Sequence, residues 1–241
     1  MPGHRFRLSL VASLVGLLLA PTVTACTSES DDGGPSHTVE QLSAALWQAD
    51  ALGDTWQDRA TGGTPAPNLL TDWCDGVVQR EVPGEPKVAQ VRLLAKGTTG
   101  TDWLDQTALV YPDSAAARAA LNDMRAQATA CPASTAVPQQ SLGPENVMDA
   151  HTRTVAVSDV TVRDWAGFVS AIGSEYPQDD AARGDNRVFA LAHGNAVLVI
   201  LLGTLRLGNE TRMNWAPVVE SLVEPILTRV EPSASPPTPG G

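Results

Sequence analysis

The chain has 241 residues, 43% of them hydrophobic and 18% charged, and its 27 acidic residues outnumber 16 basic ones. This length suits one folded domain with a real core, and a net charge of −11 disfavours nucleic acid as a partner because an acidic surface repels phosphate backbones. Ordinary solubility is the simplest explanation of the charge itself.

The N-terminus has the three parts of a bacterial lipoprotein signal. Arg5 and Arg7 are followed by an uncharged apolar run, Leu8 to Ala20, that is too short to span a bilayer. The tetrapeptide Val23-Thr24-Ala25-Cys26 then matches a lipobox. We expect residues 1–25 to be removed and Cys26 to be diacylated, which would hold the mature chain on the outer face of the cytoplasmic membrane. A secreted protein without lipid is the alternative.

Removal of the signal peptide leaves 14 basic and 27 acidic residues, a formal net charge of −13. The two other cysteines, Cys74 and Cys131, would then lie in a compartment where disulfides persist. We expect them to form one disulfide. Free thiols or metal ligands are the alternative, although neither residue has a CxxC motif or a Cys/His cluster around it.

Low-complexity segments mark both ends of the folded part. Residues 26–37 contain the lipidated cysteine and a Ser, Asp, Gly and Pro-rich stretch, which predicts a flexible spacer. Residues 232–241 are rich in Pro, Ser and Gly, which predicts a disordered tail. Residues 38–231 remain as a single domain, with no internal repeat.

In the first half of this domain, Thr38 and Gln41 have the spacing of a capping box that opens a helix. A short helical turn should follow and end at Gly53. Residues 89–94 alternate between apolar and polar, as in a half-buried strand, and residues 103–111 are expected to be the neighbouring strand.

The most regular helix is expected to begin at Asp113 or Ser114 and to end at Pro132. Its apolar side chains recur at helical spacing along one stripe: Ala117, Ala120, Leu121, Met124, Ala128 and Cys131. This spacing turns Cys131 toward the core. The disulfide would therefore join the end of the helix to the segment around Cys74.

The second half is predicted to be rich in strands. Valines alternate over residues 155–162 but change phase across Ser158-Asp159, which predicts a bulge or a turn there. Apolar runs at 187–193 and 196–203 flank Gly194-Asn195, a strong hairpin signal because glycine accepts the positive φ of tight turns.

An amphipathic helix is expected from Asn214 to Val230, packed on the sheet. Pro225 lies in its interior, lacks an N–H and crowds the carbonyl of Ser221, so it should bend or break the helix.

This order of elements resembles a known group of proteins. The likeness covers most of residues 38–231 and is carried by AALWQADALGDTW, RVFALAHGNAVLVILLG and the amphipathic C-terminal helix. The chain resembles actinobacterial lipoproteins that are grouped with the extracellular sensor domain of the PknH-type serine/threonine kinases. The resemblance implies an α+β domain with an antiparallel sheet backed by helices and a cleft for an unknown extracellular ligand. Members typically have two disulfides, whereas this chain has cysteines for one.

Motifs for chemistry are sparse. The sequence has no G-x-S-x-G elbow, H-E-x-x-H pair, P-loop or dinucleotide fingerprint, so no cofactor and no metal are expected. His151 and His193 are interpreted as structural, the first in a polar loop. An acidic stretch is interpreted as a solvated loop in preference to a calcium site or a carboxylate dyad; it contains Glu175, Asp179, Asp180 and Asp185.

The six tryptophans stand out against three phenylalanines. Core packing is the default role of each, but Trp73 and Trp103 adjoin loops with Asp and Gly and are the candidates for a ligand-binding cleft. The sequence thus predicts a membrane-anchored extracytoplasmic domain that binds a small molecule or an envelope protein without catalysis. An envelope hydrolase whose acidic site assembles only in the fold, and a module assisting another membrane protein, are the alternatives.

Overall fold

The structure is a computed structural model that describes residues 35–58, 69–71, 73–75, 79–96, 100–143, 146–177, 182–207 and 214–230. The predicted signal peptide, the predicted lipidation site Cys26 and the predicted C-terminal tail at 232–241 lie outside the described residues. Within the described ranges, no helix is both long and apolar enough to cross a membrane.

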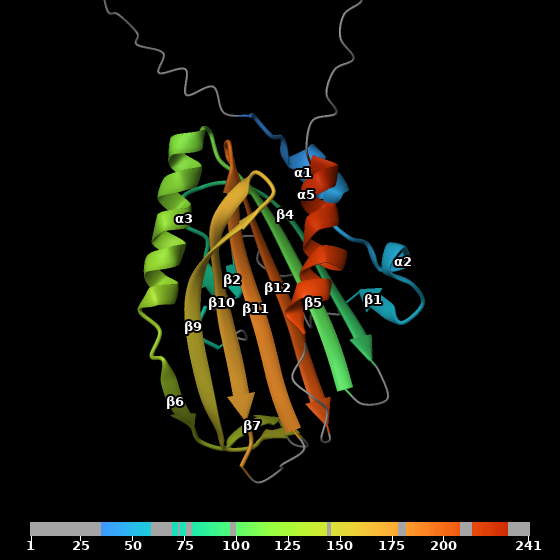
Figure 1. Cartoon of the computed structure of the whole chain (residues 1–241), viewed down its shortest axis with the longest axis vertical. Coiled ribbons are helices and arrows are strands. Elements are labelled where there is room, and N and C mark those ends of the chain that lie inside the picture. The colour runs from blue at the N-terminus through green and yellow to red at the C-terminus, as the bar shows by residue number, and fades with distance from the viewer. Residues whose placement is uncertain are drawn as a thin grey trace, which may run out of the picture. The chain divides into compact units, whose positions relative to one another are not determined.

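Eight of the described strands form one antiparallel sheet (Figure 1). They are β1 (Trp56–Asp58), β4 (Lys87–Lys96), β5 (Gly100–Val110), β6 (Ser134–Val137), β9 (His151–Val162), β10 (Trp165–Glu175), β11 (Ala182–His193) and β12 (Ala196–Leu207). The order across the sheet is β1-β4-β5-β12-β11-β10-β9-β6. Two small hairpins lie outside it, formed by β2 (Leu69–Thr71) with β3 (Gln79–Glu81) and by β7 (Gln140–Gly143) with β8 (Asn146–Met148).

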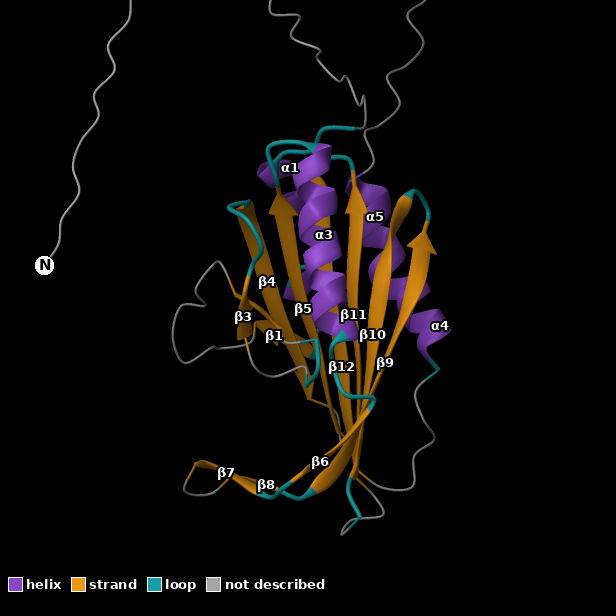
Figure 2. Cartoon of the chain, turned by 90° about the vertical axis from the view of Figure 1, so that its left-hand side faces the viewer, coloured by secondary structure: helices purple, strands orange, loops and turns teal. Residues whose placement is uncertain are grey.

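Helices cover both faces of the sheet (Figures 1 and 2). One face carries α3 (Ser114–Thr129). The other carries α1 (Val39–Ala45) and a C-terminal helix made of α4 (Trp215–Val218), a π-helical turn (Val219–Val223) and α5 (Glu224–Val230). A short α2 (Ala49–Leu52) follows α1. The predicted α+β domain with an antiparallel sheet packed against helices is confirmed.

Strand β12 supplies both cores. Its even-numbered residues from Ala196 to Leu202 pack toward α1 and α5, and its odd-numbered residues from Val197 to Leu201 pack toward α3. None of these side chains is more than 4% exposed. The uninterrupted apolar run in the sequence is therefore a strand buried on both sides.

Several local predictions are confirmed in detail. Thr38 Oγ1 accepts a hydrogen bond from the N–H of Gln41 at 3.3 Å, while the Gln41 side chain accepts one from the N–H of Thr38 at 3.0 Å, so the capping box is complete. Gly53 follows α2 with φ of +99°. Asp113 caps α3 by accepting from the N–H of Ala116 at 2.7 Å. Gly194, at φ +57°, turns β11 into β12.

The prediction of a bulge or a turn at Ser158-Asp159 is wrong. Strand β9 pairs with β10 residue by residue from Val162 to Thr152, without a shift of register. The valines change phase because they serve different cores: Val155 and Val157 lie against the α3 cluster, whereas Val160 and Val162 lie with the cluster under α1 and α5. A regular strand produces this pattern when its two halves are covered on opposite faces.

Pro225 lies two residues after the π-helical turn, and the helical path continues through it to Val230. A π turn is one residue wider than an α turn, so it makes room where a proline ring would crowd the carbonyl of Ser221. The irregularity expected at this proline is therefore a widened turn.

The linker between α1 and α2 makes hydrogen bonds to β5 and to the C-terminal helix. The side chain of Gln106 accepts from the Trp47 N–H at 2.7 Å and donates to the Trp47 carbonyl at 3.1 Å. The Trp47 indole donates to the carbonyl of Leu222 at 2.8 Å, and the guanidinium carbon of Arg229 lies 4.0 Å from the centre of the ring. These contacts connect the N-terminal helix, β5 and the C-terminal helix.

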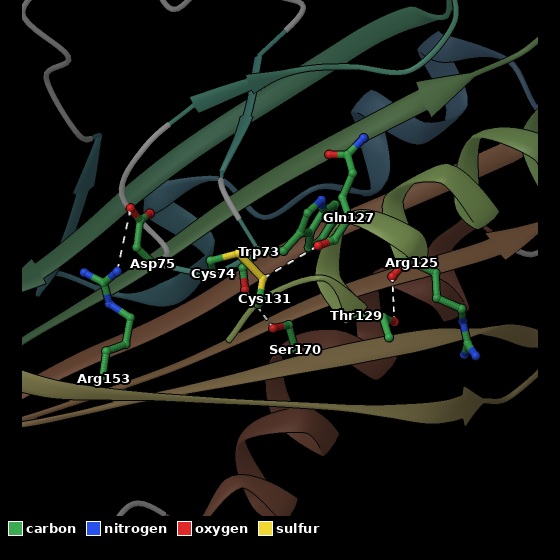
Figure 3. The surroundings of a disulfide bond; sticks show 9 residues. All are labelled: Trp73, Cys74, Asp75, Arg125, Gln127, Thr129, Cys131, Arg153 and Ser170. Atoms are coloured by element: carbon green, nitrogen blue, oxygen red, sulfur yellow. Dashed lines mark hydrogen bonds and ion pairs between the residues drawn. A yellow bond between two sulfur atoms is a disulfide. The ribbon is translucent and has the colours of Figure 1, made fainter. Parts of the chain in front are cut away.

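The predicted disulfide between Cys74 and Cys131 is present at the C-terminal end of α3 (Figure 3). The segment it holds is also bound to the sheet, because Ser170 Oγ donates to the Trp73 carbonyl at 2.9 Å. Asp75 and Arg153 lie 4.0 Å apart as an ion pair on the other side of Cys74. The disulfide thus connects the helix end to a segment that crosses the same face of the sheet.

The bond closes a loop with a sequence separation of 57. Loop closure of this length stabilises the folded state by about 4 kcal/mol. We expect the double variant Cys74→Ala/Cys131→Ala to lose about this much free energy of unfolding. Urea denaturation followed by circular dichroism measures it, with the unreduced parent as reference. An unchanged midpoint would contradict the assigned role.

Candidate functional site

The sheet face that carries α1 and α5 changes from apolar to polar along its strands. Toward the turn at Gly194 the cross-strand rows are apolar, and at the opposite end the facing residues are polar or charged. There Gly173 on β10 pairs with Thr154 on β9 and with Asp185 on β11. In the next row Glu175 faces Arg183.

A pocket of about 360 Å³ lies over this polar end. Most of its lining comes from β9, β10 and β11. The residues whose side chains share the face of α1 and α5 are Thr154, Ala156, Ala171, Glu175, Arg183, Asp185 and Arg187, with Gly173 between them. A volume of this size holds a small organic molecule.

Small residues form the floor of the pocket. A Cβ atom added to Gly173 would lie 2.9 Å from Thr154 Oγ1 and 3.9 Å from Asp185 Oδ1. The missing side chain at this position therefore keeps open the space between a hydroxyl and a carboxylate. Ala156 and Ala171 continue the floor in the next row with only methyl groups.

Two arginines near the pocket are held by neighbouring groups. The Arg187 guanidinium carbon lies 5.0 Å from the centre of the Trp215 ring at the start of α4, and its Nη1 donates to the Asn186 carbonyl at 2.9 Å. Arg206 donates to Asp102 at 2.7 Å, one strand further along the sheet. These contacts fix where the positive charges lie.

The acidic stretch singled out in the sequence is only partly brought to one place. Glu175 and Asp185 both line the pocket, from neighbouring strands. Asp179 and Asp180 lie outside the described residues. The described part of the chain contains no group of three or more His, Cys, Asp or Glu side chains arranged to hold a metal ion.

Neither tryptophan proposed for a cleft lines this pocket. Trp73 is 1% exposed and packs against Phe168 with ring centres 5.3 Å apart, so it is a core residue under α3. Trp103 covers Gly203, where a Cβ atom would lie 2.0 Å from the indole ring. Trp103 belongs with the α3 cluster, on the sheet face opposite the pocket.

His151 is not in a polar loop. It begins β9, is 4% exposed, and its Nδ1 lies 2.9 Å from the Asp149 carbonyl. Its ring packs on Tyr176 with centres 4.7 Å apart. These contacts agree with the predicted structural role of this histidine, whereas its place at the start of β9 differs from the predicted polar loop.

His37 was expected in the flexible spacer, but it is 4% exposed and belongs to the domain. Its N–H donates to Asn195 Oδ1 at 2.7 Å, and Asn195 Nδ2 donates back to the His37 carbonyl at 3.1 Å. Gly194 is required beneath this segment, since a Cβ atom there would lie 1.7 Å from the carbonyl oxygen of Pro35. Pro35 to His37, the last residues of the predicted spacer, therefore pack against the hairpin turn of the domain.

Three rings meet above the hairpin turn. His37 Nε2 lies 3.3 Å from His193 Nδ1, and the ring of Trp165 lies 5.5 Å from that of His37 and 5.3 Å from that of His193. Burial lowers the pKa of His37 below its ordinary value of 6.5, and the nearby His193 lowers it further. This cluster joins the N-terminal segment to the end of the sheet opposite the pocket.

One local pattern in the sequence indicates part of the pocket. Arg183, Asp185 and Arg187 occupy every second position, so a strand must place all three on one face. The positions of Gly173 and Thr154 beside them depend on register between three strands, which no local pattern reveals.

No family model matches the chain, and no curated protein matches it. Among solved structures it is similar to the extracellular domain of PknH from Mycobacterium tuberculosis. The TM-score is 0.52 at 14% identity, and the match covers 82% of this chain and 98% of that chain. The comparison shows a shared fold, which confirms the predicted resemblance at that level.

The lowered pKa of His37 makes stability depend on pH. An unfolded His37 takes up a proton near pH 6.5, whereas the folded protein does so only at lower pH. The unfolded state thus binds more protons in this window, and stability falls as the pH drops through it. When the pH is lowered from about 7.5 to about 5.5, the free energy of unfolding should fall less for His37→Gln than for the parent, as measured by urea denaturation. Equal losses would contradict the contribution of His37.

Proposed function

We propose that this protein is a lipid-anchored, extracytoplasmic binding domain without catalytic activity, and that the pocket at the polar end of the sheet holds its ligand. The observation that carries the proposal is the pocket itself, a volume of about 360 Å³ with a floor of glycine and alanine and charged side chains around it. Sites for small molecules combine a shaped apolar surface with a few placed polar groups in this way.

Three further observations support an extracytoplasmic location. The N-terminal sequence has the charge, apolar run and lipobox of a lipoprotein signal, and the Cys74–Cys131 disulfide suits an oxidising compartment. The fold is also that of a domain described as extracellular.

The N-terminal segment of the described domain and the pocket lie at opposite ends of the sheet. The N-terminal segment contacts the turn at Gly194 and Asn195, and the chain enters and leaves the described domain at the same end (Figure 1). Asp185 lies eight residues before His193 on β11, a distance of about 27 Å along a strand. The pocket is therefore at the end of the domain away from the segment at Pro35 to His37.

The lipid anchor predicts a clear response to Cys26→Ala. The parent protein should sediment with membranes and enter the detergent phase of a Triton X-114 extraction, because two acyl chains give stable attachment. The variant should lose both properties. A variant that still fractionates with membranes would show that Cys26 does not carry the anchor.

The binding site predicts that Ala171→Leu displaces the ligand. The added atoms fill the floor beside Gly173, where Ala171 is only partly exposed. The matched control is Ala119→Leu, the same change at an exposed position of α3 on the other face of the sheet. Both variants are purified from the envelope of the native host and measured by native mass spectrometry. The control should carry a bound small molecule, and Ala171→Leu should not. Equal retention would place the ligand elsewhere.

A further inference from the structure

The charged groups of the pocket are not all engaged by their neighbours. Arg187 is held by the Trp215 ring and the Asn186 carbonyl. The side chains of Arg183 and Asp185, by contrast, form no hydrogen bond or ion pair with a described residue, and neither does the Thr154 hydroxyl. One guanidinium, one carboxylate and one hydroxyl are thus available to a ligand within the same pocket.

The register fixes how these groups are spaced. Arg183 and Asp185 lie two residues apart on β11, so they share a face with Cα atoms about 7 Å apart. Asp185 and Thr154 lie on either side of Gly173. Thr154 Oγ1 and Asp185 Oδ1 both border the space that a side chain at Gly173 would fill. Arg183 is exposed and lies one row further out, facing Glu175.

This arrangement has a negative site at the floor and a positive site at the edge. A cation alone would make no contact with the Arg183 guanidinium, and an anion alone would meet the Asp185 carboxylate at the floor. A molecule that has an ammonium group and a carboxylate a few ångströms apart matches both sites. Charge-assisted hydrogen bonds to both groups would be the strongest contacts available to it.

The other residues that line the pocket indicate what the uncharged part of the ligand is. Ala156, Ala171 and Ala133 offer apolar contacts, and the volume of about 360 Å³ accommodates an amino acid with its side chain. An aliphatic side chain would lie over these methyl groups.

We propose that the ligand is a small zwitterion of the amino-acid class, with its ammonium group over Gly173 between Asp185 and Thr154 and its carboxylate on Arg183. This deepens the proposed function and rests on the pocket being the binding site. The charges, and not the shape alone, select the ligand.

Isothermal titration calorimetry with the full mature domain tests the ligand class. The probes are L-leucine, isoamylamine, which is leucine without its carboxylate, and 4-methylpentanoate, which is leucine without its amino group. We expect L-leucine to bind at least about tenfold more tightly than either analogue, since each lacks one charged contact. An analogue that binds as tightly as leucine would overturn the proposal, as would the absence of binding by every protein L-amino acid.

Two variants test which residue binds each charged group of the ligand. Asp185→Asn and Arg183→Gln should each weaken the zwitterion at least about tenfold, and Asp123→Asn, an exposed carboxylate on α3, should leave binding unchanged. Arg183 is exposed, so its replacement does not threaten folding. Unchanged affinity in Arg183→Gln would overturn the assignment of the carboxylate site. A different, non-zwitterionic molecule that is displaced by Ala171→Leu would refute this ligand class while leaving the binding function in place.

Discussion

The fold depends on one strand, β12, that is buried on both of its faces. Fully burying a valine, leucine or isoleucine side chain contributes roughly 1.5–3 kcal/mol, and β12 contributes such residues to two separate cores. It pairs with β5 on one side and β11 on the other, so it joins the first hairpin of the sheet to the later meander. A slip of one residue in either pairing would exchange its two apolar sets, which is why the register is strongly specified.

The pocket is a consequence of where this double burial stops. Leu202 is the last large apolar residue of β12 on the face of α1 and α5, and Thr204 follows it in the row of Asp185 and Asp102. Neighbouring strands change composition at the same level, because cross-strand partners share their environment. A floor of small residues at the end of a tightly packed core leaves space that side chains do not fill.

Local patterns in the sequence predicted the local structure well. The capping box at Thr38, the helix begun by Asp113, the hairpin at Gly194 and the Cys74–Cys131 bond each depend on residues close in sequence or on a single possible pairing. The valines of β9 gave a wrong prediction, since their pattern depends on which helical layer covers each half of the strand. His37 and the pocket depend on contacts between distant segments, and the burial of Trp73 follows from the disulfide that draws it onto the sheet. None of these has a short-range signal.

The sheet ends in very short strands on both sides, three residues in β1 and four in β6. A long outer strand presents a row of unsatisfied amides and carbonyls to which another polypeptide can add. β1 and β6 each pair with only part of the neighbouring strand, three residues of β4 and four of β9. Among the described strands, the rest of β4 and β9 has no outer neighbour, so the borders of the sheet run along these two longer strands.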